Sequence, residues 1–275
     1  MQANNITVSI PNKGCAKDCP YCISKMTGYI KTHEELFYHN LPMARRTAKR
    51  CGATHMLITS KGEPLQNIPA IKRTCEIFEK YPIEIQTNGL LLDASMGFEL
   101  QHAGVNIVAV SVDHPHYFDL NCNPQMWQAI KNFNMIARAT VMVFDIFEEW
   151  SLRDFINVCH ANGIRQLTFR SPTVPERTVP TTESKKAVQY IFDHNAPKLY
   201  KSLQQDLIDT VHAGKGNIIM QLPFGPIVYD IEGVAITSMD YCMQEQSNGL
   251  NIRSLIYMED GHLYTCWDKK GSILW

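Results

Sequence analysis

Six short apolar runs alternate with longer segments of helical period through the first two thirds of the chain. This alternation constrains the fold more than any other feature, because parallel βα units repeat in this way. Several runs are continuously apolar, as expected for parallel strands that are covered on both faces. The predicted strands are Ile6–Ile10, His55–Thr59, Ile83–Thr87, Ile107–Val112, Thr140–Phe144 and Gln166–Phe169.

Helices are predicted between these strands, at residues 33–50, 68–80, 93–103, 124–137 and 152–162. The last of them ends at Asn162-Gly163, a common C-terminal stop signal. Six such units predict an α/β fold, a partial TIM barrel of six βα units. Active sites of such barrels lie at the C-terminal ends of the strands. The residues that follow each strand are therefore the candidate site residues.

The βα alternation stops at Pro172-Thr173-Val174-Pro175, which marks a boundary. One or two helices are predicted over residues 182–212, with a break near Asn195-Ala196-Pro197. Antiparallel strands are predicted at 218–222, in a hairpin over 227–237 that turns at Glu232-Gly233, and at 252–258 and 262–267 around Asp260-Gly261. We expect a barrel core over residues 1–175 and a small C-terminal α+β extension over residues 176–275 that covers the barrel mouth.

Composition is that of an enzyme-sized globular protein. With 275 residues, 45% of them hydrophobic and 19% charged, the chain can bury a large core. A formal net charge of -1 gives no bulk attraction to nucleic acid or to membranes, although a local basic groove leaves nucleic acid not excluded. No apolar run is long enough to span a membrane, and residues 1–5 lack the features of a secretion signal. We expect a cytoplasmic protein with no membrane partner.

Three closely spaced cysteines follow the first strand, in Cys15-Ala16-Lys17-Asp18-Cys19-Pro20-Tyr21-Cys22. Iron–sulfur cubanes are normally held by four thiolates, so three ligands would leave one iron open for chemistry. The alternative is a non-catalytic zinc or Fe–S module, in which Cys242 or Cys266 completes a closed four-ligand site. Nine cysteines, an odd number in a long chain, disfavour a disulfide framework.

Polar residues also follow the other predicted strands. They are Ser60-Lys61-Gly62-Glu63-Pro64, Thr87-Asn88-Gly89, Ser111-Val112-Asp113 and Arg170-Ser171. Each is open to a plainer interpretation as a turn, a cap or, for Arg170, a surface salt bridge. His114 and His116 follow the fourth strand and are candidates for substrate binding or for an exposed turn.

The cysteine spacing resembles the hallmark of the radical S-adenosylmethionine (SAM) enzymes, Cys-x-x-x-Cys-x-aromatic-Cys, at Cys15, Cys19, Tyr21 and Cys22. Lys61-Gly62-Glu63-Pro64 resembles the family's Gly-Gly-Glu loop, which receives the methionine amino group, with Lys61 in place of the first glycine. Asn88, Ser111 and Asp113 stand where the family's strand ends approach the methionine carboxylate and the ribose. The resemblance covers about residues 5–172.

This resemblance implies a 4Fe–4S cluster and SAM as cofactors. It implies metal ligation by Cys15, Cys19 and Cys22, and SAM binding by Tyr21, Lys61, Gly62, Glu63, Asn88, Ser111, Asp113 and Arg170. The implied reaction is reductive cleavage of SAM to a 5'-deoxyadenosyl radical, which abstracts hydrogen from a nucleotide-like small molecule or a peptide; RNA base modification is the alternative. Its implied partners include an electron donor such as flavodoxin or ferredoxin, and the enzyme would be oxygen-sensitive.

The segment from Asn251 to Cys266 resembles the C-terminal hairpin of the molybdenum-cofactor GTP cyclase and of peptide-modifying relatives of the SPASM-twitch type. Cys266 stands where those proteins place an auxiliary cluster ligand. Cys242 is the only other cysteine nearby, so a complete auxiliary cluster is not expected. The four remaining cysteines share no metal spacing and are expected to pack in the core: Cys51, Cys75, Cys122 and Cys159.

Overall fold

An open, curved sheet of twelve strands forms the centre of the computed structural model, which describes residues 1–119, 121–122, 125–239, 247–248, 251–267 and 270–275. Its strands are β1 (Gln2–Ser9), β2 (His55–Thr59), β3 (Ile83–Thr87), β4 (Ile107–Val112), β5 (Ile136–Met142), β6 (Gln166–Arg170), β7 (Asn217–Gln221), β8 (Ile227–Ile231), β9 (Val234–Met239), β10 (Ser247–Asn248), β11 (Asn251–Tyr257) and β12 (Leu263–Tyr264).

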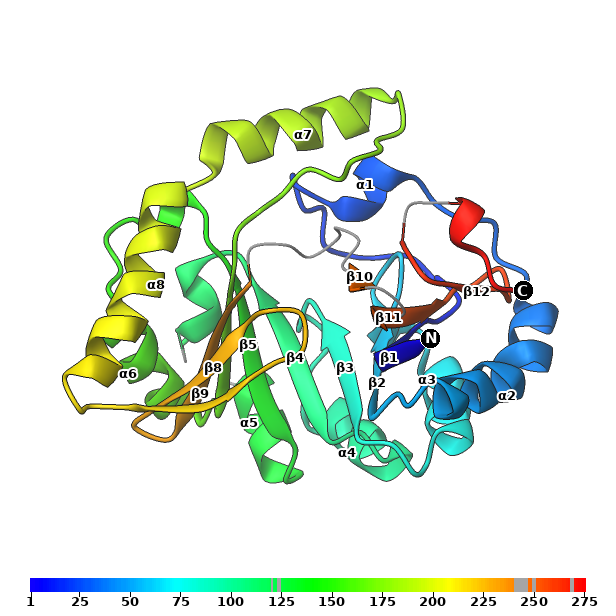
Figure 1. Cartoon of the computed structure of the whole chain (residues 1–275), viewed down its shortest axis with the longest axis horizontal. Helices are drawn as coiled ribbons and strands as arrows, with labels where there is room; N and C mark the ends of the chain where they lie inside the picture. The colour runs from blue at the N-terminus through cyan, green and yellow to red at the C-terminus, as the bar shows by residue number, and fades with distance from the viewer. Residues whose placement is uncertain (120, 123–124, 240–246, 249–250, 268–269) are drawn as a thin grey trace.

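Helices cover the outer face of this sheet (Figure 1). The α-helices are α1 (Ile23–Thr27), α2 (Glu34–Arg50), α3 (Ile68–Ile77), α4 (Ala94–Ala103), α5 (Met126–Asn132), α6 (Leu152–Asn162), α7 (Thr182–His194) and α8 (Pro197–His212). Four of them begin with side-chain caps on backbone N–H groups: Asn67 caps α3, Asp93 caps α4, Ser151 caps α6 and Thr181 caps α7. None of the described helices is long and apolar enough to cross a membrane.

Strands β1 to β6 pair in sequence order, each parallel to the next. The predicted α/β partial barrel of six βα units is therefore confirmed. Two parallel additions widen it: β11 joins the outer edge of β1, and β9 joins the outer edge of β6. Within the described residues no pairing links the two ends of the sheet, so the barrel is not closed.

The C-terminal strands belong to the same sheet as the barrel strands. The predicted local pairs are present, with β8 antiparallel to β9 and β11 antiparallel to β12. Glu232 and Gly233 turn the first hairpin with φ values of 53° and 81°, the left-handed conformation that tight hairpins require. The parallel pairing of β9 and β11 with the barrel was not predicted, because local patterns do not identify a distant partner strand.

Two boundary predictions were wrong: β1 begins at Gln2 rather than at Ile6, and the junction of α5 and β5 lies earlier than predicted. Helix α5 ends at Asn132, whereas the prediction extended it to residue 137, and β5 begins at Ile136 rather than Thr140. Asn134 has a φ of 55°, which ends the helical path. The apolar residues at this point fit the period of a helix as well as that of a strand. The pairing of Ile136 with Ile107 of β4 favours the strand.

Strand β1 shows how the fold positions the site. Its residues Ile6 and Val8 are fully buried in the hydrophobic core beneath the helices. The alternating residues Asn5, Thr7 and Ser9 instead line a cavity on the inner side of the sheet. Because successive side chains of a strand point to opposite faces, one strand supplies both the core and the wall of the cavity.

Helix α7 lies beside α1, across the upper rim of the barrel in Figure 1. Met26 of α1 packs there against Ala187 and Ile191 of α7 in a small second hydrophobic cluster. This cluster anchors the short helix that follows the three cysteines. An isolated helix of five residues would not be stable in water, so α1 depends on such contacts.

Candidate functional site

A cavity of about 490 Å³ opens at the C-terminal ends of the barrel strands. Its walls combine the segment 12–29, the loop after β2, the ends of β3 to β6 and the C-terminal residues 253–256 and 265–267. Ten of the eleven residues proposed from the sequence line it: Cys15, Cys19, Tyr21, Cys22, Lys61, Gly62, Glu63, Asn88, Ser111 and Arg170. The eleventh, Asp113, does not line the cavity but contacts Lys17 and Tyr21, which do.

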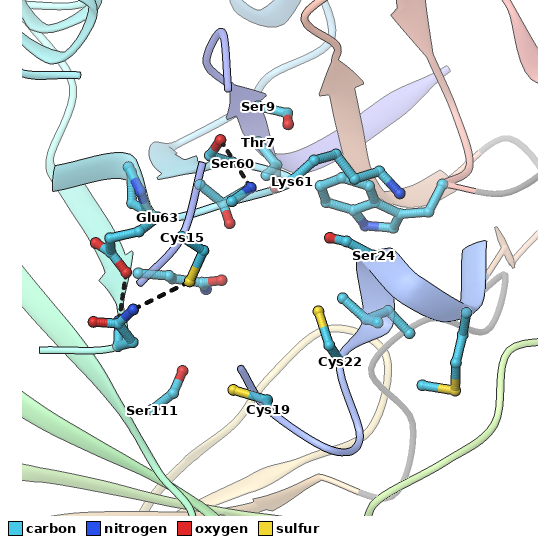
Figure 2. A pocket seen from close by; sticks show the side chains of 18 of the residues that line it. Thr7, Ser9, Cys15, Cys19, Cys22, Ser24, Ser60, Lys61, Glu63 and Ser111 are labelled. Carbon is cyan, nitrogen blue, oxygen red and sulfur yellow. Dashed lines mark hydrogen bonds between the residues drawn. The ribbon is translucent and has the colours of Figure 1, made fainter. Parts of the chain in front are cut away.

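The three cysteines surround one open space. Figure 2 shows the thiols of Cys15, Cys19 and Cys22 on different sides of it, with Ser111 near Cys19 at its lower edge. Cys15 is exposed and the other two are half-buried. In the described part of the chain, no three His, Cys, Asp or Glu side chains converge as ligands of a single ion. A cubane does not require such convergence, because each thiolate binds a different iron.

Burial raises the pKa of the Cys19 thiol to about 11. This side chain therefore stays protonated in the metal-free protein, and metal binding must displace its proton. Cys266, which the sequence placed near a second metal site, is buried and lines the same cavity. Cys242, its candidate partner, lies outside the described residues.

The remaining cysteines divide into two groups. Cys51, Cys75 and Cys159 are buried, as predicted. Cys122 is exposed, so its prediction as a core residue was wrong. Its thiol donates to the Asp119 carboxylate three residues earlier in the chain. Both residues lie outside every predicted strand and helix.

Gly62 forms a close contact with the chain just before the cysteines. A Cβ atom at this position would lie 2.1 Å from Asn12 Oδ1 and 2.2 Å from the Gly14 carbonyl oxygen. The neighbouring backbone N–H of Glu63 donates to that same carbonyl at 2.8 Å. Only glycine permits this approach, which fixes the start of the cysteine loop, defined as residues 15–22.

Glu63 is 3% exposed and joins the ends of β2 and β3. Its carboxylate accepts hydrogen bonds from the Thr87 hydroxyl at 2.6 Å, the Asn88 backbone N–H at 2.9 Å and the Leu65 backbone N–H at 3.0 Å. Burial raises the pKa of Glu63, while these hydrogen bonds act in the opposite direction. The carboxylate thus fixes the position of the Asn88 backbone at the edge of the cavity.

The other strand-end residues lie around the same space. Asn88 donates from Nδ2 to the Cys15 sulfur at 3.5 Å, and its Oδ1 accepts from the Leu90 backbone N–H at 2.9 Å. Ser111 and Arg170 line the cavity from β4 and β6. His114 and His116 contact each other in an exposed turn and do not line the cavity.

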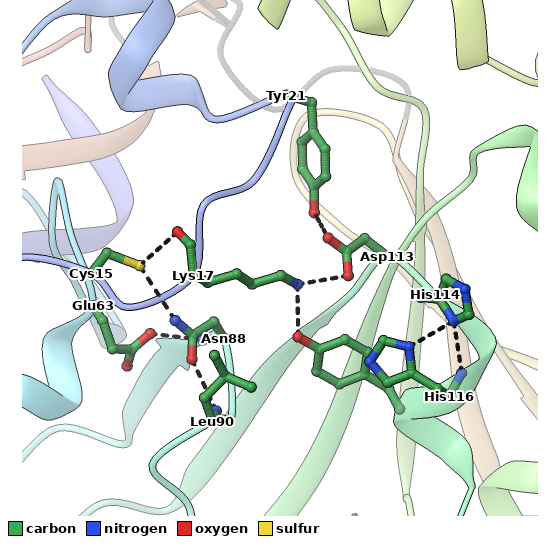
Figure 3. Close-up of polar contacts among 10 residues, drawn as sticks. Cys15, Lys17, Tyr21, Glu63, Asn88, Leu90, Asp113, His114 and His116 are labelled. Carbon is green, nitrogen blue, oxygen red and sulfur yellow. Dashed lines mark hydrogen bonds and ion pairs between the residues drawn. The ribbon is translucent and has the colours of Figure 1, made fainter. Parts of the chain in front are cut away.

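Asp113 binds two side chains of the cysteine loop. Its Oδ1 atom lies 2.6 Å from Lys17 Nζ, and its Oδ2 atom accepts a hydrogen bond from the Tyr21 hydroxyl at 2.6 Å (Figure 3). Lys17 also donates to the Tyr117 hydroxyl at 2.7 Å. Burial by itself lowers the pKa of Lys17, but the Asp113 carboxylate and the Tyr117 hydroxyl outweigh it and raise that pKa.

Lys61, which stands in place of a glycine of the family loop, turns its side chain toward α1. Its Nζ donates to the Thr27 hydroxyl at 2.7 Å. The residue is only 9% exposed, and burial lowers the pKa of its amine. Among the described carboxylates, none lies within ion-pair distance of it.

Two residues that hold this site together were not predicted from the sequence. Lys17 sits between two cysteines and gave no signal of its own. Glu259 is buried after β11, and its Oε2 accepts from the Asn12 backbone N–H at 2.9 Å and the Thr32 hydroxyl at 2.8 Å. The sequence predicted a turn at Asp260-Gly261. It did not predict the contact of Glu259 with Asn12, because these residues are 247 positions apart.

A family model described as "Radical SAM superfamily" matches residues 9–146, half of the chain. The chain belongs to the radical SAM superfamily. It is therefore an enzyme, and a 4Fe–4S cluster and SAM are its cofactors. The matched region contains the cysteine loop and every strand end from β1 to β5. Superfamily membership overturns the alternative of a non-catalytic zinc module.

Two curated proteins are similar over parts of this radical SAM chain. GTP 3',8-cyclase of Clostridium acetobutylicum is 29% identical over 136 residues, which are 48% of the chain and 40% of that protein. 7-Carboxy-7-deazaguanine synthase of Prochlorococcus marinus is 34% identical over 84 residues, 28% of the chain and 37% of that protein. The matches thus span well under two thirds of either relative.

Among solved structures, SuiB of Streptococcus suis bound to its precursor peptide SuiA superposes on 96% of the chain with a TM-score of 0.62 and 14% identity. The superposition covers 60% of SuiB. SuiB bound to S-adenosylmethionine gives a TM-score of 0.56 at 12% identity. At these identities the likeness concerns the fold, and it extends through the C-terminal strands.

Proposed function

We propose that the chain cleaves SAM reductively and directs the resulting radical at a hydrogen atom of a bound small molecule or peptide. When bound, the cluster supplies the electron that splits SAM into methionine and a 5'-deoxyadenosyl radical. The observation that carries the proposal is the position of three thiols around one open space at the C-terminal end of a parallel barrel. An electron donor of the flavodoxin or ferredoxin type would reduce the cluster.

The donor set fits the two cofactors. We propose that Cys15, Cys19 and Cys22 are the cluster ligands, since thiolate is the ligand that iron–sulfur clusters select. The close approach at Gly62 leaves the neighbouring backbone groups at the edge of the cavity, where they can receive the polar end of SAM. Further SAM contacts are proposed for Tyr21, Lys61, Glu63, Asn88, Ser111 and Arg170, which line the same cavity.

A substrate compartment is proposed deeper in the barrel. The cavity continues along β1 from Ser9 past Thr7 to Asn5, which is four residues or about 13 Å away. The Ser9 hydroxyl and the Asn5 Oδ1 atom are buried there, and neither has a partner in the described part of the chain. Buried polar groups are nearly always satisfied, so these two favour a substrate with hydrogen-bonding groups.

Anaerobic reconstitution tests the proposed function. We expect about four irons per chain by metal analysis and an electron paramagnetic resonance signal of the reduced cluster that changes when SAM is added. Replacing Cys15, Cys19 and Cys22 together by Ala should abolish both. A colourless protein that binds one zinc and ignores SAM would reject the proposal.

A further inference from the structure

We propose that two lysines, the half-buried Lys17 and the buried Lys61, clamp the cysteine loop and α1 to two different strand ends, so that the three thiols are positioned before any cluster is bound. The inference rests on the proposed function only in assigning those thiols to the cluster. Both lysines act here as positioning residues through their hydrogen bonds to Asp113, Tyr117 and Thr27, and this role of Lys61 is separate from the SAM contact proposed for it above. Asp113 becomes part of the clamp.

The first half of the clamp is the ion pair of Lys17 and Asp113. Its two side chains are 17% and 12% exposed, so the pair is largely shielded from water. Lys17 Nζ also lies 4.6 Å from the centre of the Tyr117 ring, which adds a cation–π contact to its hydrogen bond with that residue's hydroxyl. Removing one partner would leave a largely shielded charge without its counter-ion, which costs more than losing a surface pair.

The same carboxylate holds the loop at a second point. Lys17 binds one oxygen of Asp113, and the Tyr21 hydroxyl donates to the other (Figure 3). Cys19 lies between these two attachment points. The loop forms no helix or strand of its own, so side-chain contacts must offset the entropy lost when it is ordered.

The second half of the clamp is the contact of Lys61 with Thr27. Lys61 follows β2, and Thr27 is the last residue of α1. The Thr27 hydroxyl itself donates to the Ile23 carbonyl at 2.8 Å, so the Lys61 amine binds a hydroxyl already fixed by the helix. A cation is also favourable beside the C-terminal end of a helix. Because Cys22 directly precedes α1, fixing the C-terminal end of this helix also restrains the position of Cys22.

A contrasting ion pair shows what a clamp contact requires. Lys25 pairs with Asp18, but both residues belong to the segment that carries the cysteines, and Asp18 is 89% exposed. That pair cannot attach the loop to the barrel. The Lys17 and Lys61 contacts instead cross 96 and 34 sequence positions to separate strand ends.

Hydrogen exchange of the full-length metal-free protein tests the clamp. We expect Lys17→Met, Asp113→Asn and Lys61→Met each to speed amide exchange in residues 15–28 by about tenfold or more, while β3 and β5 keep their protection. Lys72→Met is the matched control, because it removes a lysine from the surface pair with Glu99. Lys17→Met combined with Asp113→Asn should exceed either single change by less than the sum of the two, since both break the same ion pair.

A milder variant keeps the test decisive if a charge change unfolds the chain. Tyr21→Phe removes only the hydroxyl that binds Asp113 and should speed exchange around Cys19 with little loss of global stability. In the reconstituted protein, we expect Lys17→Met to broaden the electron paramagnetic resonance signal of the reduced cluster, and Lys17→Arg to restore it in part. A merely structural contact would not change that signal.

The outcomes separate the clamp from the proposed function. Wild-type exchange rates in residues 15–28 of folded Lys17→Met, Lys61→Met and Tyr21→Phe proteins would overturn the clamp, even if a cluster binds. Faster exchange in these variants, in a chain that never binds iron, would uphold the clamp and reject the proposed function.

Discussion

The Glu63 carboxylate links the ends of two barrel strands, since its Oε2 atom lies 2.9 Å from the backbone nitrogen of Asn88. Two further donors, the Thr87 hydroxyl and the Leu65 N–H, occupy its other oxygen. This one side chain therefore fixes the rim from which Asn88 reaches the Cys15 sulfur. A residue expected to bind a cofactor also holds the site together.

Glu63→Gln should destabilise the protein by about 1–3 kcal/mol, because the amide nitrogen places a donor against backbone or hydroxyl donors in a buried site. The free energy of unfolding in urea measures this loss. Glu99→Gln is the control, since Glu99 pairs with Lys72 on the surface and its loss should cost under about 0.5 kcal/mol. Equal costs for the two variants would contradict the role given to Glu63.

Gly62→Ala should displace the chain before Cys15, because the new methyl group would overlap Asn12 Oδ1 and the Gly14 carbonyl. We expect a loss of about 1–3 kcal/mol in stability and a weakened response of the reduced cluster to SAM. Gly271→Ala meets nothing within 4 Å and should behave like the wild type. A normal SAM response in Gly62→Ala would show that this approach is not required.

Glu259→Ala should loosen the segment before the cysteines from the C-terminal side. The change leaves the Asn12 N–H and the Thr32 hydroxyl without their buried acceptor, at a cost of about 1–3 kcal/mol. Amide exchange at Asn12 should therefore be faster than in the wild type. An unchanged exchange rate at that amide would argue that the C-terminal strands do not support the cysteine loop.

Ser9→Ala should leave stability unchanged or slightly raised in the absence of substrate. The Ser9 hydroxyl is fully buried and has no partner in the described part of the chain, so its removal relieves a desolvated polar group. Urea unfolding of the cofactor-free protein gives the comparison. A loss above about 1 kcal/mol would mean that the hydroxyl serves the fold rather than a ligand.

Cluster assembly should protect Cys15 from alkylation but not Cys122. Both thiols are exposed in the metal-free protein, which makes Cys122 a matched internal control. We expect iodoacetamide to modify both before reconstitution, and only Cys122 afterwards, with the modified positions read by peptide mass spectrometry. Continued modification of Cys15 in iron-loaded protein would remove it from the ligand set.

The sequence predicted the barrel and the position of its site because both depend on local signals. Strands β2, β3 and β4 have the predicted bounds, since apolar runs flanked by turn residues mark them on their own. The cysteine loop and the polar strand ends were found for the same reason. The C-terminal end of each strand then placed their residues in one cavity.

Contacts between distant segments were not predictable in this way. Asp113 was proposed as a cofactor contact, yet its carboxylate accepts from Lys17, and no local pattern indicates a pairing across 96 positions. The same holds for β9 and β11, whose alternation fits an antiparallel hairpin but does not identify β6 or β1 as further partners. Tertiary packing decides such pairings.

Formation of 5'-deoxyadenosine is the most direct test of radical SAM chemistry in this chain. The reconstituted protein would be reduced with dithionite without oxygen, given SAM, and analysed by mass spectrometry beside the Cys19→Ala variant. We predict 5'-deoxyadenosine and methionine from the wild type and neither from the variant. A wild type with a full cluster and bound SAM that forms no 5'-deoxyadenosine, with or without candidate nucleotides and peptides, would contradict the proposed function.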